Sequence, residues 1–251
     1  MNLLRGIPAA LSLYTKIPVL LKNWNDGDYR RAFLFFPVAG IPLGLLSFGL
    51  WYICEYFHLP HIFTTGLLFV LSFLIVGGLH YDGFADTEDA LSSMADKEKK
   101  LEILKDPHAG AFAFIALLRH AVFYLSFLYL WIEKADEKMM IFYGLIFVLS
   151  RALCGLSSSI LKKARSEGML YEETKGKGKT VVISFICWII LTLFAMGCID
   201  VYKTLAVVVI GVFFFVYYIH MTYTNFGGVT GDTAGYFVVI MEGLSLGSVF
   251  F

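Results

Sequence analysis

The chain has 251 residues, of which 58% are hydrophobic, 17% aromatic and only 16% charged, with a mean hydropathy of +0.73 and a formal net charge of zero. A soluble domain carries about a quarter charged residues, so the composition argues against an ordinary water-soluble fold. It favours an all-α, polytopic integral membrane protein whose partner is the lipid bilayer. The balanced charge gives no indication of a nucleic-acid partner, and we expect none.

The N-terminal stretch, residues 1–22, carries apolar residues at helical spacing but is interrupted by Pro8 and Pro18. It has no continuous apolar core and no convincing cleavage site, so it does not resemble a secretory signal. Arg5 and Lys16 flank the apolar residues. Two interpretations stay open: a short helix lying on the membrane surface, or a helix docked on the bundle.

Seven apolar segments follow. They cover residues 32–57, 62–79, 111–132, 139–161, 180–199, 205–222 and 235–251. The first six hold about 18–26 residues each, against the ~20 that cross a bilayer as a helix. The seventh contains three glycines and Glu242 and is the least typical span. We therefore predict one membrane-embedded domain, residues 1–251, with about seven transmembrane segments.

The distribution of Lys and Arg predicts the orientation of this bundle. Fifteen of the twenty lie in the N-terminal stretch and in the loops 80–110 and 162–179, whereas three, Lys134, Lys138 and Lys203, lie on the opposite side. Under the positive-inside rule the N-terminus and the basic loops are cytoplasmic. The same alternation places a second glycine-rich, acidic loop, residues 223–236, on the cytoplasmic side, so the two acidic regions could meet in space.

Residues 77–89, Gly-Gly-Leu-His-Tyr-Asp-Gly-Phe-Ala-Asp-Thr-Glu-Asp, hold the densest group of carboxylates. Asp82, Asp86 and Asp89 follow the spacing i, i+4, i+7, which on a helix sets all three on one face. Three like charges repel unless a cation lies among them, and Mg²⁺ prefers oxygen ligands. Glu88 lies off this face and is expected to be solvated. The alternative is that all are solvated carboxylates, one of them capping a helix.

Two neighbours of these aspartates have candidate roles. Gly83 leaves one flank of the segment bare, so that a diphosphate could approach the backbone closely. His80 is a candidate general base or hydrogen-bond donor. Downstream, residues 94–106 predict a separate cytoplasmic helix that Asp96 caps and Pro107 ends.

The second acidic loop, residues 223–236, combines a hydroxyl, a flexible backbone and a carboxylate in Thr230, Gly231 and Asp232. Its glycines could expose backbone N–H groups to an anion. Asp232 is a candidate metal ligand or proton acceptor. The alternative is a flexible loop with an incidental aspartate.

Two arginines, Arg119 and Arg151, fall inside predicted spans, where a charge costs roughly 2.5–3.5 kcal/mol even on the mildest scale. Glu242 is the candidate partner for a structural ion pair, and phosphate binding by an arginine is the alternative. The basic loop 162–179 could attract an anionic substrate, but the topology rule accounts for most of its charge.

Three motifs, Gly77–Asp89, Leu104–Phe112 and Gly227–Asp232, resemble the cobalamin synthase (adenosylcobinamide-GDP ribazoletransferase) family, and the resemblance runs from about residue 5 to the C-terminus. One departure is Ala90–Met94, where the family usually has a glycine-containing turn. Asp106 lies in the second motif. The resemblance implies that Asp106 contacts the substrate, together with the residues Gly83, Thr230, Gly231 and Arg151.

The resemblance also implies the reaction. The family transfers the adenosylcobinamide phosphate of adenosylcobinamide-GDP to α-ribazole or its 5′-phosphate, which gives adenosylcobalamin or its 5′-phosphate and GMP. It does so with Mg²⁺ at the bacterial inner membrane, with the active site facing the cytoplasm. We expect the metal ligands to be Asp82, Asp86, Asp89 and Asp232, and the catalytic base to be His80 or Asp232. The sequence leaves a homo-oligomer open.

Two other functions match part of the sequence pattern. CDP-alcohol phosphotransferases also use aspartates at a membrane edge, in a DxxDGxxAR…GxxxDxxxD pattern, but here Ala85 is followed by Asp86 instead of Arg. An ion-coupled transporter could use Arg119, Arg151 and Glu242 as its pathway. Such a protein is expected to show an internal repeat and mid-span acids, whereas the acids of this chain gather at one side.

Overall fold

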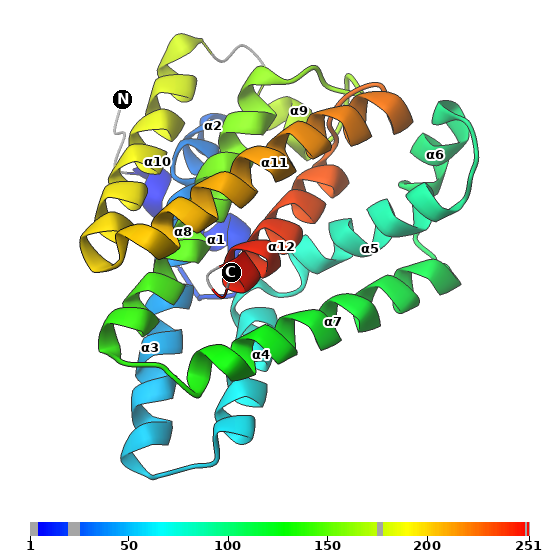
Figure 1. Cartoon of the computed structure of the whole chain (residues 1–251). Coiled ribbons are helices and arrows are strands. Elements are labelled where there is room, and N and C mark those ends of the chain that lie inside the picture. The colour runs from blue at the N-terminus through cyan, green and yellow to red at the C-terminus, as the bar shows by residue number, and fades with distance from the viewer. Residues whose placement is uncertain (1–4, 20–25, 175–177, 249, 251) are drawn as a thin grey trace.

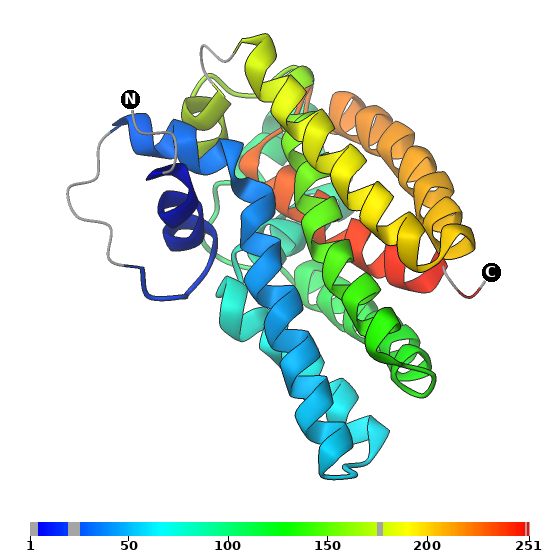
Figure 2. The same cartoon turned by 90° about the vertical axis from the view of Figure 1, so that its left-hand side faces the viewer.

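The computed structural model describes residues 5–19, 26–174, 178–248 and 250, and these residues form a helical bundle (Figures 1 and 2). In chain order the helices are α1 (Gly6–Tyr14), α2 (Asp26–Leu34), the 3₁₀ turn η2 (Phe36–Ala39), α3 (Gly40–Tyr56), α4 (His61–Val76), α5 (Leu79–Ser92), α6 (Lys97–Ile103), α7 (Ala111–Ile132), α8 (Glu137–Ile160), α9 (Met169–Thr174), α10 (Lys179–Ile199), α11 (Val201–Asn225) and α12 (Gly231–Ser248). The predicted all-α class is confirmed.

Five segments of the described chain are long and apolar enough to cross a membrane: η2 with α3, α7, α8, α10 and α11. The predicted segment 62–79 is shorter, because Gly77 and Gly78 adopt φ values of 70° and 81° and end α4. There the chain bends by 95° into α5, and the two helices together would make a sixth, broken span. Because α5 carries four carboxylates, we place it outside the membrane-spanning segments. The predicted segment 235–251 corresponds to α12, which is not among the five.

Helices α3 and α8 touch through glycine. A Cβ added at Gly40 would lie 2.6 Å from the backbone of Phe147, and one at Gly44 would lie 2.9 Å from the Cα of Gly144. Small residues four apart allow this close approach between helix backbones. Gly40 and Gly44 therefore serve the packing of α3 on α8.

Helix α1 is docked on the bundle. Arg5 donates from Nε and Nη2 to the two carboxylate oxygens of Asp28 in α2, at 2.9 and 3.1 Å. Arg31 donates to the same carboxylate at 2.7 Å. Tyr14, at the end of α1, packs on Phe36 with ring centroids 4.5 Å apart. Of the two interpretations of residues 1–22, the docked helix holds for α1, Gly6–Tyr14.

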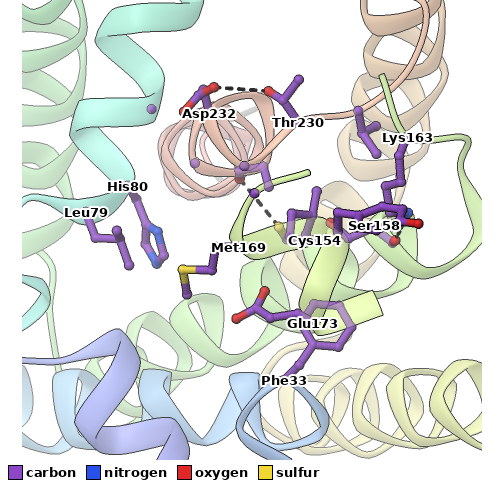
Figure 3. A pocket seen from close by; sticks show the side chains of 18 of the residues that line it. Phe33, Leu79, His80, Cys154, Ser158, Lys163, Met169, Glu173, Thr230 and Asp232 are labelled. Atoms are coloured by element: carbon purple, nitrogen blue, oxygen red, sulfur yellow. Dashed lines mark hydrogen bonds between the residues drawn. The ribbon is translucent and has the colours of Figure 1, made fainter. Parts of the chain in front are cut away.

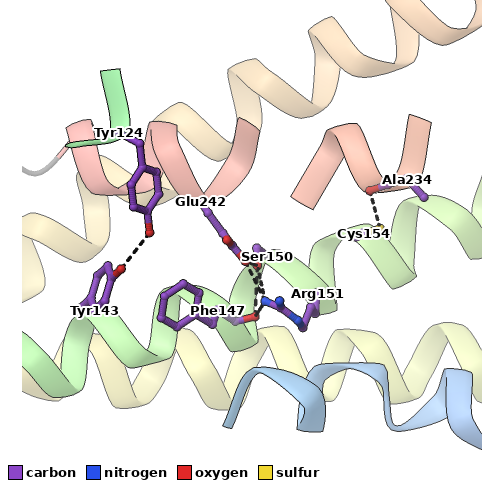
Figure 4. A network of polar contacts seen from close by, with 8 residues as sticks. All are labelled: Tyr124, Tyr143, Phe147, Ser150, Arg151, Cys154, Ala234 and Glu242. Atoms are coloured by element: carbon purple, nitrogen blue, oxygen red, sulfur yellow. Dashed lines mark hydrogen bonds and ion pairs between the residues drawn. The ribbon is translucent and has the colours of Figure 1, made fainter. Parts of the chain in front are cut away.

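Arg151, which is buried in the bundle, is paired with a carboxylate (Figure 4). Arg151 of α8 donates to Glu242 of α12 at 2.7 Å, and Ser150 donates to the same oxygen at 3.0 Å. This is the structural ion pair that the sequence offered as one alternative. Arg119 instead donates to Glu88 of α5 at 2.9 Å, and the Glu88 side chain is only 13% exposed. The expectation of a solvated Glu88 was wrong, since α7 brings a cation to it.

Helices α5 and α12 lie side by side in Figure 1, and glycines set their spacing. A Cβ at Gly83 would lie 2.9 Å from the Cα of Asp232, and one at Gly235 would lie 2.9 Å from the carbonyl oxygen of His80. The first turns of the two helices therefore touch, and the two acidic stretches meet as expected.

The predicted helix at 94–106 is α6, with Asp96 as its N-cap: its carboxylate accepts from the backbone N–H of Lys99 at 2.9 Å. Lys100 donates to Asn225 at 2.6 Å and so ties α6 to the end of α11. Met94, in the stretch where the family usually has a glycine, adopts a φ of 53°. This left-handed conformation favours glycine over methionine.

Candidate active site

A cavity of about 270 Å³ opens where the first turns of α5 and α12 meet the end of α8 (Figure 3). Loop 161–168, helix α9, Tyr14 of α1, Phe33 of α2 and Phe36 of η2 also line it. Six of the residues singled out from the sequence line it: His80, Asp82, Gly83, Thr230, Gly231 and Asp232. Asp86, Asp89, Asp106 and Arg151 do not.

The carboxylates of α5 form the predicted face. Asp82 is exposed and Asp86 is half-buried on the same helix. Burial raises the pKa of Asp86 to about 6, and the charges of Asp82, Asp232 and Asp89 add to that rise. The cluster is therefore strained by its own negative charge, which a bound cation would relieve.

Asp232 is held at the first turn of α12 by a reciprocal cap. The backbone N–H of Thr230 donates to Thr233 Oγ1 at 2.9 Å, and the N–H of Thr233 donates to Thr230 Oγ1 at 3.1 Å. Thr230 Oγ1 also donates to Asp232 Oδ2 at 3.4 Å. Burial raises the pKa of Asp232, and the positive charge of Arg165 opposes this rise.

The carboxylates near the cavity fit the expected Mg²⁺ only in part. Among the described residues no three His, Cys, Asp or Glu side chains are arranged to hold an ion. Asp89 turns its carboxylate to Gly110, where an added Cβ would lie 2.3 Å from Oδ1, so the four expected ligands do not form a ready-made shell. Mg²⁺ usually takes one or two protein carboxylates, waters and substrate phosphates. Asp82 and Asp232 on the cavity, with Asp86 beside them, fit that mode of binding.

His80 is buried at the cavity wall, with 7% of its surface exposed, and Phe36 packs edge-on against its ring. Its Nε2 atom has no hydrogen-bond partner within the described chain. Burial lowers the pKa of His80 well below its usual value, and the charge of Arg151 lowers it further. The imidazole is therefore neutral at pH 7, and its Nε2 is available to a substrate group.

Residues from a third region also line the cavity and were not singled out from the sequence. Loop 161–168 pairs with the second glycine-rich loop: the N–H of Val229 donates to Lys162 at 2.9 Å, and the N–H of Ala164 donates to Val229 at 3.0 Å. This pairing brings Lys163 and Arg165 to the cavity. The basic charge of residues 162–179 was the available signal, and it had been explained mainly by topology.

Helix α9 closes the cavity beside α1. Tyr14 donates to Glu173 at 2.5 Å, and both side chains are buried cavity residues. Burial and the neighbouring Glu173 charge raise the pKa of Tyr14 well above its usual value. Tyr14 therefore stays protonated and acts as a donor that fixes α9 in place.

Two of the expected substrate contacts lie elsewhere. Asp106 is exposed on the loop after α6, and its carboxylate accepts from the backbone N–H of His108 at 2.9 Å. Hydrogen bonds from His108 lower the pKa of Asp106. The Arg151 side chain is 1% exposed and forms an ion pair with Glu242. Their expected substrate contacts have no counterpart in the cavity lining.

Comparison with known proteins gives one consistent result. The family model described as "Cobalamin-5-phosphate synthase" matches residues 6–250. A protein of Lachnoclostridium phytofermentans named adenosylcobinamide-GDP ribazoletransferase is 37% identical, over 98% of this chain and 94% of its own. Proteins of the same name from Alkaliphilus oremlandii and Clostridium perfringens are 30% and 28% identical, over 98% and 95% of this chain and 97% and 94% of their own.

No solved structure matches the chain. The family model, however, spans nearly every residue, and the motifs that carry the resemblance, Gly77–Asp89 and Gly227–Asp232, supply Asp82 and Asp232 to one cavity. The chain therefore belongs to the cobalamin-5-phosphate synthase family.

Proposed function

We propose that the chain is an adenosylcobinamide-GDP ribazoletransferase: it transfers the adenosylcobinamide phosphate of adenosylcobinamide-GDP to α-ribazole or its 5′-phosphate, and GMP leaves. The observation that carries this proposal is the full-length relationship to proteins of that name, 37% identical over 98% of the chain. The cavity supports it, because a phosphoryl-transfer site needs carboxylates and close backbone approach at one point.

In this reaction a ribose hydroxyl oxygen of α-ribazole bonds to the phosphorus nearer the cobinamide. The bond from that phosphorus to the bridging diphosphate oxygen breaks, and GMP carries the oxygen away. The hydroxyl proton passes to Asp232 or to His80 Nε2. Asp232 can accept the proton because burial raises its pKa. His80 can accept it because its imidazole is neutral and its Nε2 has no hydrogen-bond partner among the described residues.

The other cavity residues position the substrate. Gly231 presents bare backbone beside Asp232, so that phosphate oxygens can approach the start of α12, whereas the bare side of Gly83 packs against the backbone of Asp232. Asp82 and Asp86 would hold Mg²⁺, and Asp232 would complete the metal shell where His80 takes the proton. Asp89 would add to the negative field. When bound, the ion neutralises charge on the phosphate oxygens. Phosphoryl transfer is catalysed mostly by positioning the reacting groups and by neutralising the charge on the phosphate oxygens.

The distribution of Lys and Arg supports a location in the bacterial plasma membrane with the N-terminus and the cavity on the cytoplasmic side. The cavity gathers the start of α5, the loop after α8 and the start of α12, which the charge count assigns to one side. A nucleotide substrate would therefore reach the cavity from the cytoplasm.

The test is an assay of purified protein with adenosylcobinamide-GDP, α-ribazole and Mg²⁺. We expect GMP and adenosylcobalamin in equal amounts, and no GMP in a control without α-ribazole. A parallel incubation with a CDP-alcohol should give no CMP. The absence of α-ribazole-dependent GMP from folded protein would refute the proposed function.

A further inference from the structure

Loop 161–168 brings two cations to the cavity, and they differ in what they contact. Lys163 directs its ammonium group to the end of α8, where it donates to the carbonyl oxygens of Ser158 and of Leu161, the latter at 2.9 Å. A cation at a helix C-terminus stabilises the helix. Lys163 is therefore engaged in holding α8.

Arg165 is only partly engaged. Its Nη2 donates to the carbonyl oxygen of Leu101 in α6. Its Nε is buried and has no hydrogen-bond acceptor within the described residues, although Arg165 lines the cavity. A buried donor without an acceptor costs about 1–3 kcal/mol. An acceptor that enters the cavity would remove this cost.

The position of Arg165 is fixed on three sides. The adjacent Ala164 donates to Val229 of the second glycine-rich loop at 3.0 Å. Glu167, two residues on, pairs with Lys105 at 2.6 Å. With the anchor on Leu101, these contacts hold the guanidinium at the cavity before a ligand binds. A fork that is already oriented loses little entropy on binding.

The charge of Arg165 also acts within the cavity. It opposes the rise in the pKa of Asp232, so the two side chains lie within electrostatic reach, yet no ion pair joins them. A diphosphate brings further negative charge to a cavity that already holds Asp82 and Asp232. In the described chain, Lys163 and Arg165 are the Lys and Arg side chains that line this cavity. Of the two, Arg165 has a buried N–H donor, its Nε, that lacks a hydrogen-bond acceptor.

We propose that the Arg165 guanidinium binds oxygens of the nucleotide phosphate that departs as GMP. This inference rests on the proposed function and adds a residue to it. Arginine suits the role, because its planar fork binds phosphate through two parallel hydrogen bonds, which a lysine does not reproduce.

The test measures GMP against guanosine, which differ only in the phosphate. We expect Arg165→Gln to weaken binding of GMP, measured by calorimetry or product inhibition, at least about 10-fold, with guanosine binding unchanged. Arg165→Lys should recover only part of the GMP affinity. Lys162→Gln removes the same charge from an exposed neighbour outside the cavity lining, and should leave both affinities within about 2-fold.

Activity separates this inference from the proposed function. In Arg165→Gln the KM for adenosylcobinamide-GDP should rise, whereas the KM for α-ribazole should not. A wild type without GMP release would refute the function, but the GMP–guanosine comparison would still decide whether Arg165 binds phosphate. Unchanged GMP affinity in both Arg165 variants would overturn the inference.

A measurement on the wild type covers the case in which both variants fail to fold. A guanidine-modifying dicarbonyl reagent should label Arg165, and mass spectrometry of the peptides would quantify that label. GMP, but not guanosine, should protect Arg165 from the reagent. Equal labelling with and without GMP would overturn the inference.

Discussion

Replacing Asp86 with asparagine should stabilise the metal-free protein at neutral pH. Asp86 has a pKa of about 6 in the folded chain against an ordinary 3.8, because burial and the neighbouring aspartates disfavour its ionised form. A carboxyl whose pKa is raised on folding binds its proton more tightly when folded, so its ionisation destabilises the fold. This cost is absent below about pH 4, grows between pH 4 and 6, and is constant above pH 6.

The size of the effect follows from the same values. The difference between 3.8 and about 6 would correspond to about 3 kcal/mol for a fully shielded group. Because Asp86 is only half-buried, solvent screening reduces the expected gain to about 1 kcal/mol, or about 2–4 °C in unfolding temperature.

The assay is thermal unfolding in detergent with a chelator, at pH 4, 6 and 7.5. Asp86→Asn should unfold at a higher temperature than the wild type at pH 7.5 and at the same temperature at pH 4. Glu98→Gln, which removes an exposed carboxylate from α6, should match the wild type throughout. An Asp86→Asn variant that is no more stable than the wild type at pH 7.5 would refute the reasoning.

Three further predictions concern the fold, each measured by thermal unfolding in detergent. Gly44→Val should cost about 1–3 kcal/mol, because a Cβ there would lie 2.9 Å from the facing backbone of α8, whereas Gly49→Val, with nothing within 4 Å, should be close to neutral. Equal effects would contradict the packing account. Met94→Gly should stabilise by up to about 1 kcal/mol, since φ is 53°, and a loss of stability would argue against that conformation. Glu242→Gln should lower the free energy of unfolding by about 3 kcal/mol, because it leaves the buried charge of Arg151 without its partner. Adding Arg151→Met to this variant should restore much of the lost stability. A Glu242→Gln variant as stable as the wild type would contradict a buried ion pair.

Local patterns predicted the parts of the site that depend on neighbours in sequence. The i, i+4, i+7 spacing of Asp82, Asp86 and Asp89 gave one face of α5, and Asp96 marked the start of α6. The small residues Gly83 and Gly235 account for the contact between α5 and α12. The aspartate spacing and the helix cap act within one or two helical turns, whereas the two glycines join helices far apart in the sequence.

The rest depends on long-range contacts that have no local signature. Arg165 reaches the cavity because Lys163 pairs with Val229, and α9 closes it because Tyr14 meets Glu173, 159 residues away. The span count differed for a similar reason. Gly77 and Gly78, which have positive φ, end the apolar run 62–79 in a bend of 95° between α4 and α5. A hydropathy profile does not detect such a bend.

The most direct test of the account compares the wild type with Asp82→Asn in α-ribazole-dependent GMP release, with equal amounts of folded protein. Asp82 is exposed and lines the cavity, so the asparagine side chain should preserve the fold. The substitution removes one carboxylate that would hold Mg²⁺ beside the phosphates. We predict a fall in rate of at least about 100-fold, with an unfolding temperature no lower than that of the wild type. A rate like that of the wild type would contradict the claim that the cavity between α5 and α12 carries out the transfer.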